Sequence, residues 1–88
     1  MYCIYILYSE KFDRYYIGQT QDVVSRLARH NARLEKSTSP YVPWRLLGFV
    51  EKGTRGEAMV LERKLKNLNR VRLLAFVSKY CIEGHDEA

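Results

Sequence analysis

Short apolar runs and polar breaks alternate in the first half of the chain in a way that is typical of β-strands. An aromatic and β-branched run extends from Tyr2 to Tyr8, and the polar stretch from Ser9 to Arg14 separates it from a second run, Tyr15 to Ile17. Such residues are enriched in strands, so the two runs predict an antiparallel hairpin. Gly18 closes the second run, where a tight turn into a helix favours a residue without a side chain. A third strand is predicted from Trp44 to Val50.

The segment after the hairpin has the apolar spacing of a helix. We expect Thr20 to be its N-cap, Asp22 to lie in the first turn, and the helix to end near Asn31. Val23 and Leu27, one turn apart, would face the core. From residue 31 to residue 43 the chain is polar and contains Ser and Pro, which indicates a loop or a short extra helical turn.

Two more helices are predicted in the second half. The pattern Thr54-Arg55-Gly56-Glu57 is typical of a capping box, in which the threonine hydroxyl and the glutamate carboxylate each accept from an unpaired backbone N–H. The inward stripe of that helix recurs at spacings of three and four: Ala58, Leu61, Leu65 and Leu68. Asn69 can cap a final helix that carries, on one side, Val71, Leu74, Ala75 and Ser78.

This order of elements predicts an α+β fold: a small three-stranded antiparallel sheet flanked by helices (β-β-α-β-α-α). A chain of 88 residues has room for one domain, because a chain this short buries only roughly 60% of its unfolded surface. We expect the domain to cover residues 1–80 and residues 81–88 to be a frayed acidic tail.

Composition narrows the class of protein. The chain is 47% apolar and 28% charged, without low-complexity tracts, as in ordinary soluble domains. The N-terminal apolar run is too short for a membrane span and lacks the features of a signal peptide, so we expect a cytoplasmic protein with no membrane partner. Cys3 and Cys81 lack metal-ligand spacing and are interpreted as reduced thiols.

A formal charge of +5 in so small a protein favours a polyanionic partner. Arg26, His30 and Arg33 recur at helical spacing and share one face of the first predicted helix, with Arg29 beside them. Such a face can equally be a solvated helix surface, so charge alone leaves nucleic-acid binding and simple solvation open. Oligomeric state has no signature in the sequence.

Five elements in order resemble the GIY-YIG nuclease superfamily, and in particular its small standalone bacterial members. They are Cys3-Ile4-Tyr5, Tyr16-Ile17-Gly18, Arg26, His30 four residues later, and Glu62 in the helix that follows the third strand. The resemblance extends from about residue 2 to residue 67. Any one element is a weak signal, but their joint order and spacing are specific.

The resemblance implies an endonuclease that hydrolyses phosphodiester bonds in DNA, directed by structure or backbone, with DNA repair or recombination as its setting. Tyr16 would take the proton from the attacking water, Tyr5 would position water or phosphate, and Arg26 would bind the scissile phosphate. Glu62 would hold one divalent metal ion, Mg²⁺ or Mn²⁺, and His30 would contact the phosphate or act as an acid or base. Further DNA contacts are expected from four basic residues: Arg29, Arg33, Lys64 and Lys66.

Three departures from the family pattern bear on activity. Cys3 replaces the glycine that names the first motif and removes no reacting group. Gln19 stands where excision-repair relatives have a lysine, so one phosphate-binding cation is missing. The asparagine of larger members has no clear counterpart, although Asn67 and Asn69 lie in that region.

Other interpretations of the same residues remain open. The tyrosines are also ordinary strand residues, and Glu62 can pair with Lys66 one turn later. A catalytically weak nucleic-acid-binding module of the same fold is the main alternative. A domain whose basic face meets an acidic protein is another.

Overall fold

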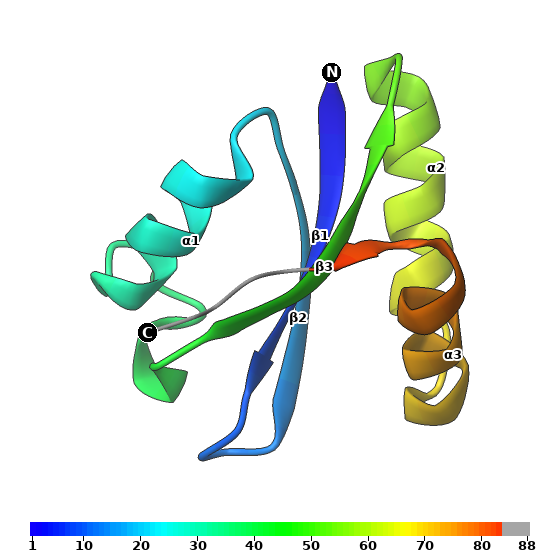
Figure 1. Ribbon diagram of the computed structural model, residues 1–88. Coiled ribbons are helices and arrows are strands. Elements are labelled where there is room, and N and C mark those ends of the chain that lie inside the picture. Colours follow the sequence, from blue (N-terminus) through cyan, green and yellow to red (C-terminus); the bar gives the residue numbers. More distant parts are fainter. Residues whose placement is uncertain (84–88) are drawn as a thin grey trace.

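The computed structural model describes residues 1–83, which form an antiparallel sheet covered on both faces by helices (Figure 1). The strand order is β2-β1-β3-β4, and every neighbouring pair is antiparallel. The bounds are Tyr2–Ser9 for β1, Arg14–Thr20 for β2, Arg45–Lys52 for β3 and Ile82–Glu83 for β4. The three longer strands confirm the predicted sheet, and β4 adds a short edge to it.

The central strand β1 sorts its side chains to two faces of the sheet, because successive side chains of a strand point to opposite sides. Ile4 and Ile6 enter one core with residues of the two C-terminal helices. Tyr5 and Leu7 enter a second core with Trp44 and Leu46. All four β1 side chains are at most 1% exposed. The alternation therefore places Tyr5 on the face opposite to Ile4 and Ile6.

The helices divide between these two faces, as Figure 1 shows. Helix α1, Val23–Asn31, lies on the side of Tyr5, and its Val23 and Leu27 pack on that core as predicted. Helices α2, Arg55–Lys66, and α3, Arg70–Tyr80, lie on the other side. A single 3₁₀ turn, Ser39–Tyr41, interrupts the long connection from α1 to β3.

The helix N-termini differ in detail from the sequence patterns. Asp22, not Thr20, caps α1, and its Oδ1 accepts from the backbone N–H of Ser25 at 3.1 Å. Thr20 ends β2 instead, and its hydroxyl accepts from the backbone of Asp22. Thr54 caps α2 by accepting from the N–H of Glu57 at 3.2 Å, as predicted. The Glu57 carboxylate, however, accepts from the Thr54 hydroxyl and not from its backbone, so only half of the capping box forms.

Helix α2 faces the core with the predicted stripe, whereas α3 turns a different side inward. Ala58 and Leu65 are buried, with Leu61 and Leu68 packed beside them. In α3, capped by Asn69 as predicted, the buried residue is Leu73, and Phe76 and Val77 pack next to it. The side that carries Val71 and Leu74 faces solvent, with Val71 77% exposed. Apolar residues occur on more than one side of α3, so the pattern of this helix alone does not select the side that faces the sheet.

The prediction of a frayed tail from residue 81 is wrong for its first residues. Ile82 pairs with Phe49, and Glu83 pairs with Gly48. A Cβ atom at Gly48 would lie 2.8 Å from the Cβ of Cys81, so this glycine admits the returning chain. Residues 84–88 lie outside the described part of the protein.

Residues 1–83 contain two free cysteines and no membrane-spanning helix. Cys3 and Cys81 are free thiols, and burial raises the pKa of both, that of Cys81 to about 11. No helix in this range is long and apolar enough to cross a membrane.

Candidate active site

Tyr5 occupies the centre of the α1 face and is 1% exposed. Its hydroxyl lies 2.9 Å from Nε2 of His30. Burial raises the pKa of Tyr5, and the neighbouring Tyr16 adds to the rise, while the guanidinium of Arg26 opposes it. Tyr5 is therefore held as a neutral phenol at physiological pH, close to a cation.

His30 connects Tyr5 to the loop after α1 and has both ring nitrogens engaged. Its Nδ1 lies 2.7 Å from the hydroxyl of Thr38, which in turn donates to the carbonyl of Glu35 at 3.3 Å. Since the hydroxyl proton goes to that carbonyl, Thr38 accepts from Nδ1–H, and the unprotonated Nε2 accepts from the Tyr5 hydroxyl. Burial lowers the pKa of His30, in keeping with a neutral ring. The hydrogen-bond chain thus runs in one direction, from Tyr5 to the Glu35 carbonyl.

The end of α1 is fixed to the start of β3, which determines where His30 sits. The Asn31 side chain donates to the carbonyl of Trp44 at 3.0 Å and accepts from its N–H at 2.6 Å, as a neighbouring strand would. The Trp44 indole donates to the carbonyl of Thr38 at 3.0 Å. Trp44 is therefore hydrogen-bonded both to Asn31, at the end of α1, and to Thr38, which contacts the His30 ring.

Gly18 is needed for clearance between the tyrosines, and the predicted reason for it was wrong. No glycine in the described residues has a positive φ, and Gly18 lies within β2, directly opposite Tyr5. A Cβ atom at this position would lie 2.5 Å from the Tyr5 hydroxyl oxygen and 2.9 Å from Cε2 of Tyr16. Because Gly18 has no side chain, the rings of Tyr5 and Tyr16 can occupy the space beside it.

Tyr16 and Arg26 complete a cluster with Tyr5 and His30. Tyr16 is half-buried, with its ring centroid 5.0 Å from that of His30 and 6.2 Å from that of Tyr5. Arg26 is half-buried one helical turn before His30 and acts on the pKa of Tyr5. We call these four residues the tyrosine cluster. The structure therefore brings together four of the five residues predicted to be catalytic.

Glu62, the fifth, belongs to α2 and pairs with Lys66 of the same helix. Its side chain is 21% exposed, and its Oε2 lies 3.0 Å from Nζ of Lys66. Lys66 also lines a hollow beside Tyr16. The pairing predicted as an ordinary helix contact is thus present.

Glu62 is the one carboxylate that lines a hollow on the outer side of α2, together with two basic side chains. This hollow of about 420 Å³ is lined also by the amide of Asn67 and by Arg63, Lys66 and Met59. No group of three His, Cys, Asp or Glu side chains that could hold a metal exists in the described range. A lone carboxylate fits Mg²⁺, which keeps several waters and takes further oxygens from substrate phosphates.

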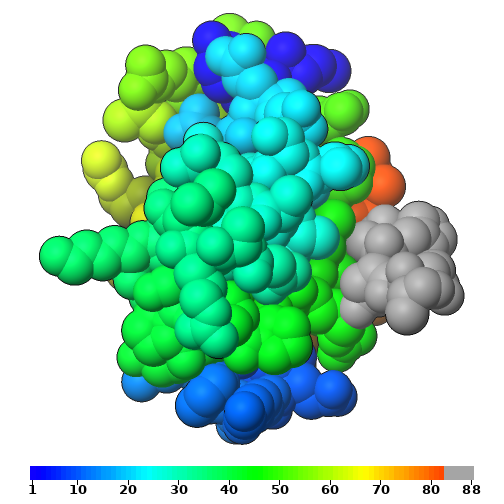
Figure 2. All heavy atoms as spheres, turned by 90° about the vertical axis from the view of Figure 1, so that its left-hand side faces the viewer, coloured from blue at the N-terminus to red at the C-terminus, as the bar shows by residue number. Residues whose placement is uncertain are grey.

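The basic residues predicted to bind DNA are exposed but do not form one surface. Arg29 pairs with Glu35 at 2.8 Å and lowers the pKa of that carboxyl, and Arg33 donates to the carbonyl of Ser39. Lys64 lines a different hollow from Lys66. Figure 2 shows α1 and its following loop across the middle of this face, with the β1–β2 hairpin at one end.

Sequence reasoning missed the residues that support the cluster from the long loop. Thr38 is 1% exposed and its hydroxyl partners His30, yet it stands in a polar stretch without any periodic pattern. The sequence marks Asn31 only as the end of a helix and gives no sign of its hydrogen bonds to Trp44. The burial of His30 was also unexpected, because its neighbours along the helix face are arginines.

Comparison with known proteins agrees with this arrangement. A search of curated proteins returned no match. Among solved structures, the chain is similar to the solution NMR structure of a UPF0213 protein from Bacillus halodurans, with 31% identity and a TM-score of 0.56. The match covers 89% of this chain and 84% of that one. The family model described as the GIY-YIG catalytic domain matches residues 1–74. The chain therefore belongs to the GIY-YIG nuclease family.

Proposed function

We propose that this protein is a metal-dependent endonuclease that hydrolyses phosphodiester bonds in DNA and is directed by nucleic-acid structure or backbone. The observation that carries the proposal is the tyrosine cluster, in which two phenols, a guanidinium and a neutral imidazole meet on one face of the sheet. Membership of the family supports the reaction class. Such an activity would serve DNA repair or recombination in the cytoplasm.

The geometry distinguishes the two tyrosines. Tyr5 donates a hydrogen bond to His30 and has a raised pKa, so it stays a neutral phenol with a fixed orientation and is a poor candidate for the base. Tyr16 is less buried and lines an open groove beside Lys66. We therefore assign Tyr16 as the group that accepts the proton of the attacking water. His30 acts through Tyr5 and is a positioning residue, since its ring is 1% exposed and both nitrogens are engaged.

Arg26 is the proposed phosphate ligand. Its planar fork can bind two phosphate oxygens at once and neutralise charge that grows on them as the water attacks. It also lies near enough to Tyr5 to lower that pKa against the effect of burial. Arg26 would thus hold the phosphate at the tyrosine cluster, where Tyr16 is the more exposed of the two phenols.

Glu62 is the proposed ligand of the metal ion. When bound there, Mg²⁺ or Mn²⁺ would supply positive charge to the phosphate oxygens and promote ionisation of water. Lys66 must first release the carboxylate, and because Lys66 is 55% exposed and water reaches the pair, the contact is weak enough to exchange. The freed ammonium would then be available to a phosphate.

Two observations favour the alternative of a binding module without efficient turnover. Glu62 is paired with Lys66, and Gln19, next to Gly18 on β2, supplies no cation. This alternative predicts that the protein binds DNA without a metal ion. It also predicts that no DNA is cleaved under any condition.

The two functions are separated by one panel experiment. Purified protein is incubated with single-stranded, duplex, overhanging and branched DNA of matched sequence, with Mg²⁺, with Mn²⁺ and with chelator. Cleavage that needs metal supports the nuclease. Binding of the same panel without any cleavage would leave only the binding module, and absence of both would refute either assignment.

A further inference from the structure

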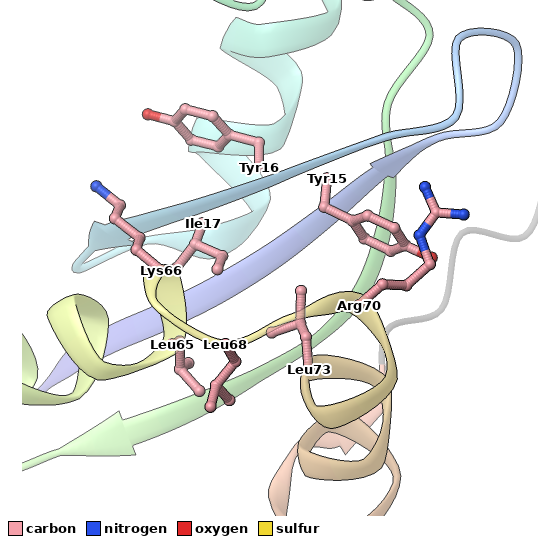
Figure 3. A pocket seen from close by; sticks show the side chains of 8 residues that line it. All are labelled: Tyr15, Tyr16, Ile17, Leu65, Lys66, Leu68, Arg70 and Leu73. Carbon is pink, nitrogen blue, oxygen red and sulfur yellow. The ribbon is translucent and has the colours of Figure 1, made fainter.

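A groove of about 360 Å³ runs beside β2, which is an edge strand of the sheet. Its other wall is the junction between α2 and α3. The floor is apolar and is made by Ile17, Leu65, Leu68 and Leu73. Figure 3 shows Tyr15 and Arg70 together at one end of the groove and Lys66 at the other, where the ring of Tyr16 is directed to the opposite side of β2. The Lys66 end therefore adjoins the proposed active site across the edge strand β2, and the other end has no assigned role.

The far end combines a flat ring with a held cation. The guanidinium carbon of Arg70 lies 5.2 Å from the centroid of the Tyr15 ring. Nη2 of Arg70 donates to Oδ2 of Asp13 at 3.0 Å and approaches the Asp13 carbonyl oxygen at 3.5 Å. Asp13 is itself fixed by the Tyr8 hydroxyl, which donates to its other oxygen at 2.9 Å. An arginine carries five N–H donors, so these contacts orient the guanidinium and leave donors for a ligand.

We propose that this groove binds one unpaired nucleotide that flanks the scissile phosphate. The base would lie against Tyr15 and the apolar floor, Arg70 would bind its outer phosphate, and Lys66 would bind the phosphate beside Tyr16. This inference rests on the proposed function, because it takes the Lys66 end to adjoin the site of cleavage. Its consequence is a preference for DNA with a single strand next to the cut.

The chemistry of the groove fits this occupant better than a paired one. A base presents its flat face to a side chain only when it is out of the duplex, and aromatic rings with basic grooves are the usual binding surface for single strands. An apolar floor between two cations matches a base between two phosphates. Asp13 is the acidic residue at the Arg70 end, and its charge is already compensated by Arg70.

Binding measured in chelator tests the groove apart from catalysis. Fluorescence anisotropy compares single-stranded and blunt duplex DNA of the same sequence for the wild type, Arg70→Gln, and Arg72→Gln. The last is a matched loss of charge on the same helix at a residue outside the groove lining. For Arg70→Gln we expect single-strand affinity to fall about 5- to 20-fold, and its log-log salt slope to fall by about 0.7, the value for one phosphate contact. For Arg72→Gln we expect little change in either.

Two more variants separate binding from structure. Asp13→Asn breaks the same ion pair but keeps the cation, so single-strand affinity should be retained or increased. Tyr15→Leu keeps an apolar side chain and removes the ring, and single-strand affinity should fall about 5- to 100-fold, as for loss of one stacked base. If Tyr15→Leu fails to fold, photocrosslinking of bromouracil-labelled single strands to the wild type provides the same information, with Tyr15 expected as an adduct.

Several outcomes would overturn the groove. They are equal losses in Arg70→Gln and Arg72→Gln, an equal loss on duplex DNA, an affinity loss in Asp13→Asn as large as that in Arg70→Gln, or crosslinks that avoid Tyr15. Selective binding of an acidic protein in place of DNA would also refute it. If the wild type cleaves DNA but the variants show none of the expected differences in binding, the proposed nuclease activity is supported and the groove is refuted. If the variants show those differences but the wild type does not cleave DNA, the groove is supported and the nuclease activity is refuted.

Discussion

Replacement of Gly18 by alanine tests the packing on which the tyrosine cluster depends. The new methyl group would lie 2.5 Å from the Tyr5 hydroxyl oxygen and 2.6 Å from its Cζ. Tyr5 cannot easily move away, since it is 1% exposed and hydrogen-bonded to His30. Either the ring shifts and breaks that bond, or the two strands separate locally.

The cost can be bounded from these contacts. Overpacking of a core costs typically about 1–3 kcal/mol. Leaving the buried Nε2 of His30 without its donor would add roughly 1–3 kcal/mol. The φ of Gly18 is not positive, so alanine suffers no backbone strain, and the lower entropy of the unfolded chain returns about 0.4–1 kcal/mol. We expect the free energy of unfolding to fall by about 1–3 kcal/mol, the net of these effects when the hydrogen bond partly survives.

Gly56→Ala is the matched control, because a Cβ atom there meets nothing within 4 Å. Gly56 lies in α2, where alanine should raise stability by about 0.5–1 kcal/mol. Urea unfolding followed by the fluorescence of Trp44, the single tryptophan, gives both values, and this residue packs on Tyr16 with ring centroids 6.3 Å apart. If Gly18→Ala were as stable as the wild type, the tyrosines would have room to spare, and the clearance role of Gly18 would be refuted.

Three other predictions concern the chemistry of the cluster. Tyr16→Phe should reduce turnover by roughly 10²- to 10⁴-fold and Tyr5→Phe by much less, since only the first removes the proposed base; equal rates in single-turnover cleavage would contradict the roles. Arg26→Lys keeps the charge but loses the two-pronged phosphate contact, so the rate should fall more than the DNA affinity, and a parallel loss of both would argue against it. Because the pKa of folded His30 lies below its unfolded value of about 6.5, the unfolded state binds more protons at low pH, and stability should fall as pH drops below that value. His30→Gln should flatten this slope in urea unfolding between pH 7 and pH 5, and an unchanged slope would show that His30 does not titrate there.

Local patterns in the sequence were sufficient for the strands and for most of the helix starts. The apolar run of β1 and the stripe of α2 each encode their own burial, because alternation or a spacing of three and four is visible within one element. The order of Tyr5, Tyr16, Arg26 and Glu62 was sufficient to recognise the family. That these residues take part in the reaction remains a prediction.

The remaining features depend on contacts between distant segments. His30 looks like part of a basic helix face until the loop closes over it, and Thr38, eight residues later, has no pattern that would mark it as its partner. Gly18 looks like a turn glycine because its neighbour across the sheet, Tyr5, is not visible from the local sequence. The inward side of α3 likewise follows from packing, since its apolar residues occur on more than one side of the helix.

The most direct test of the central claim compares wild type with Glu62→Gln in single-turnover cleavage of a labelled DNA substrate, with Mg²⁺ and with chelator. Glu51→Gln serves as control, because it removes an equal charge from an exposed residue of β3. We predict metal-dependent cleavage by the wild type and the control, no cleavage by Glu62→Gln, and urea unfolding of Glu62→Gln that stays cooperative. Cleavage by Glu62→Gln at the wild-type rate, or by the wild type in chelator, would contradict a metal-dependent nuclease that uses this carboxylate.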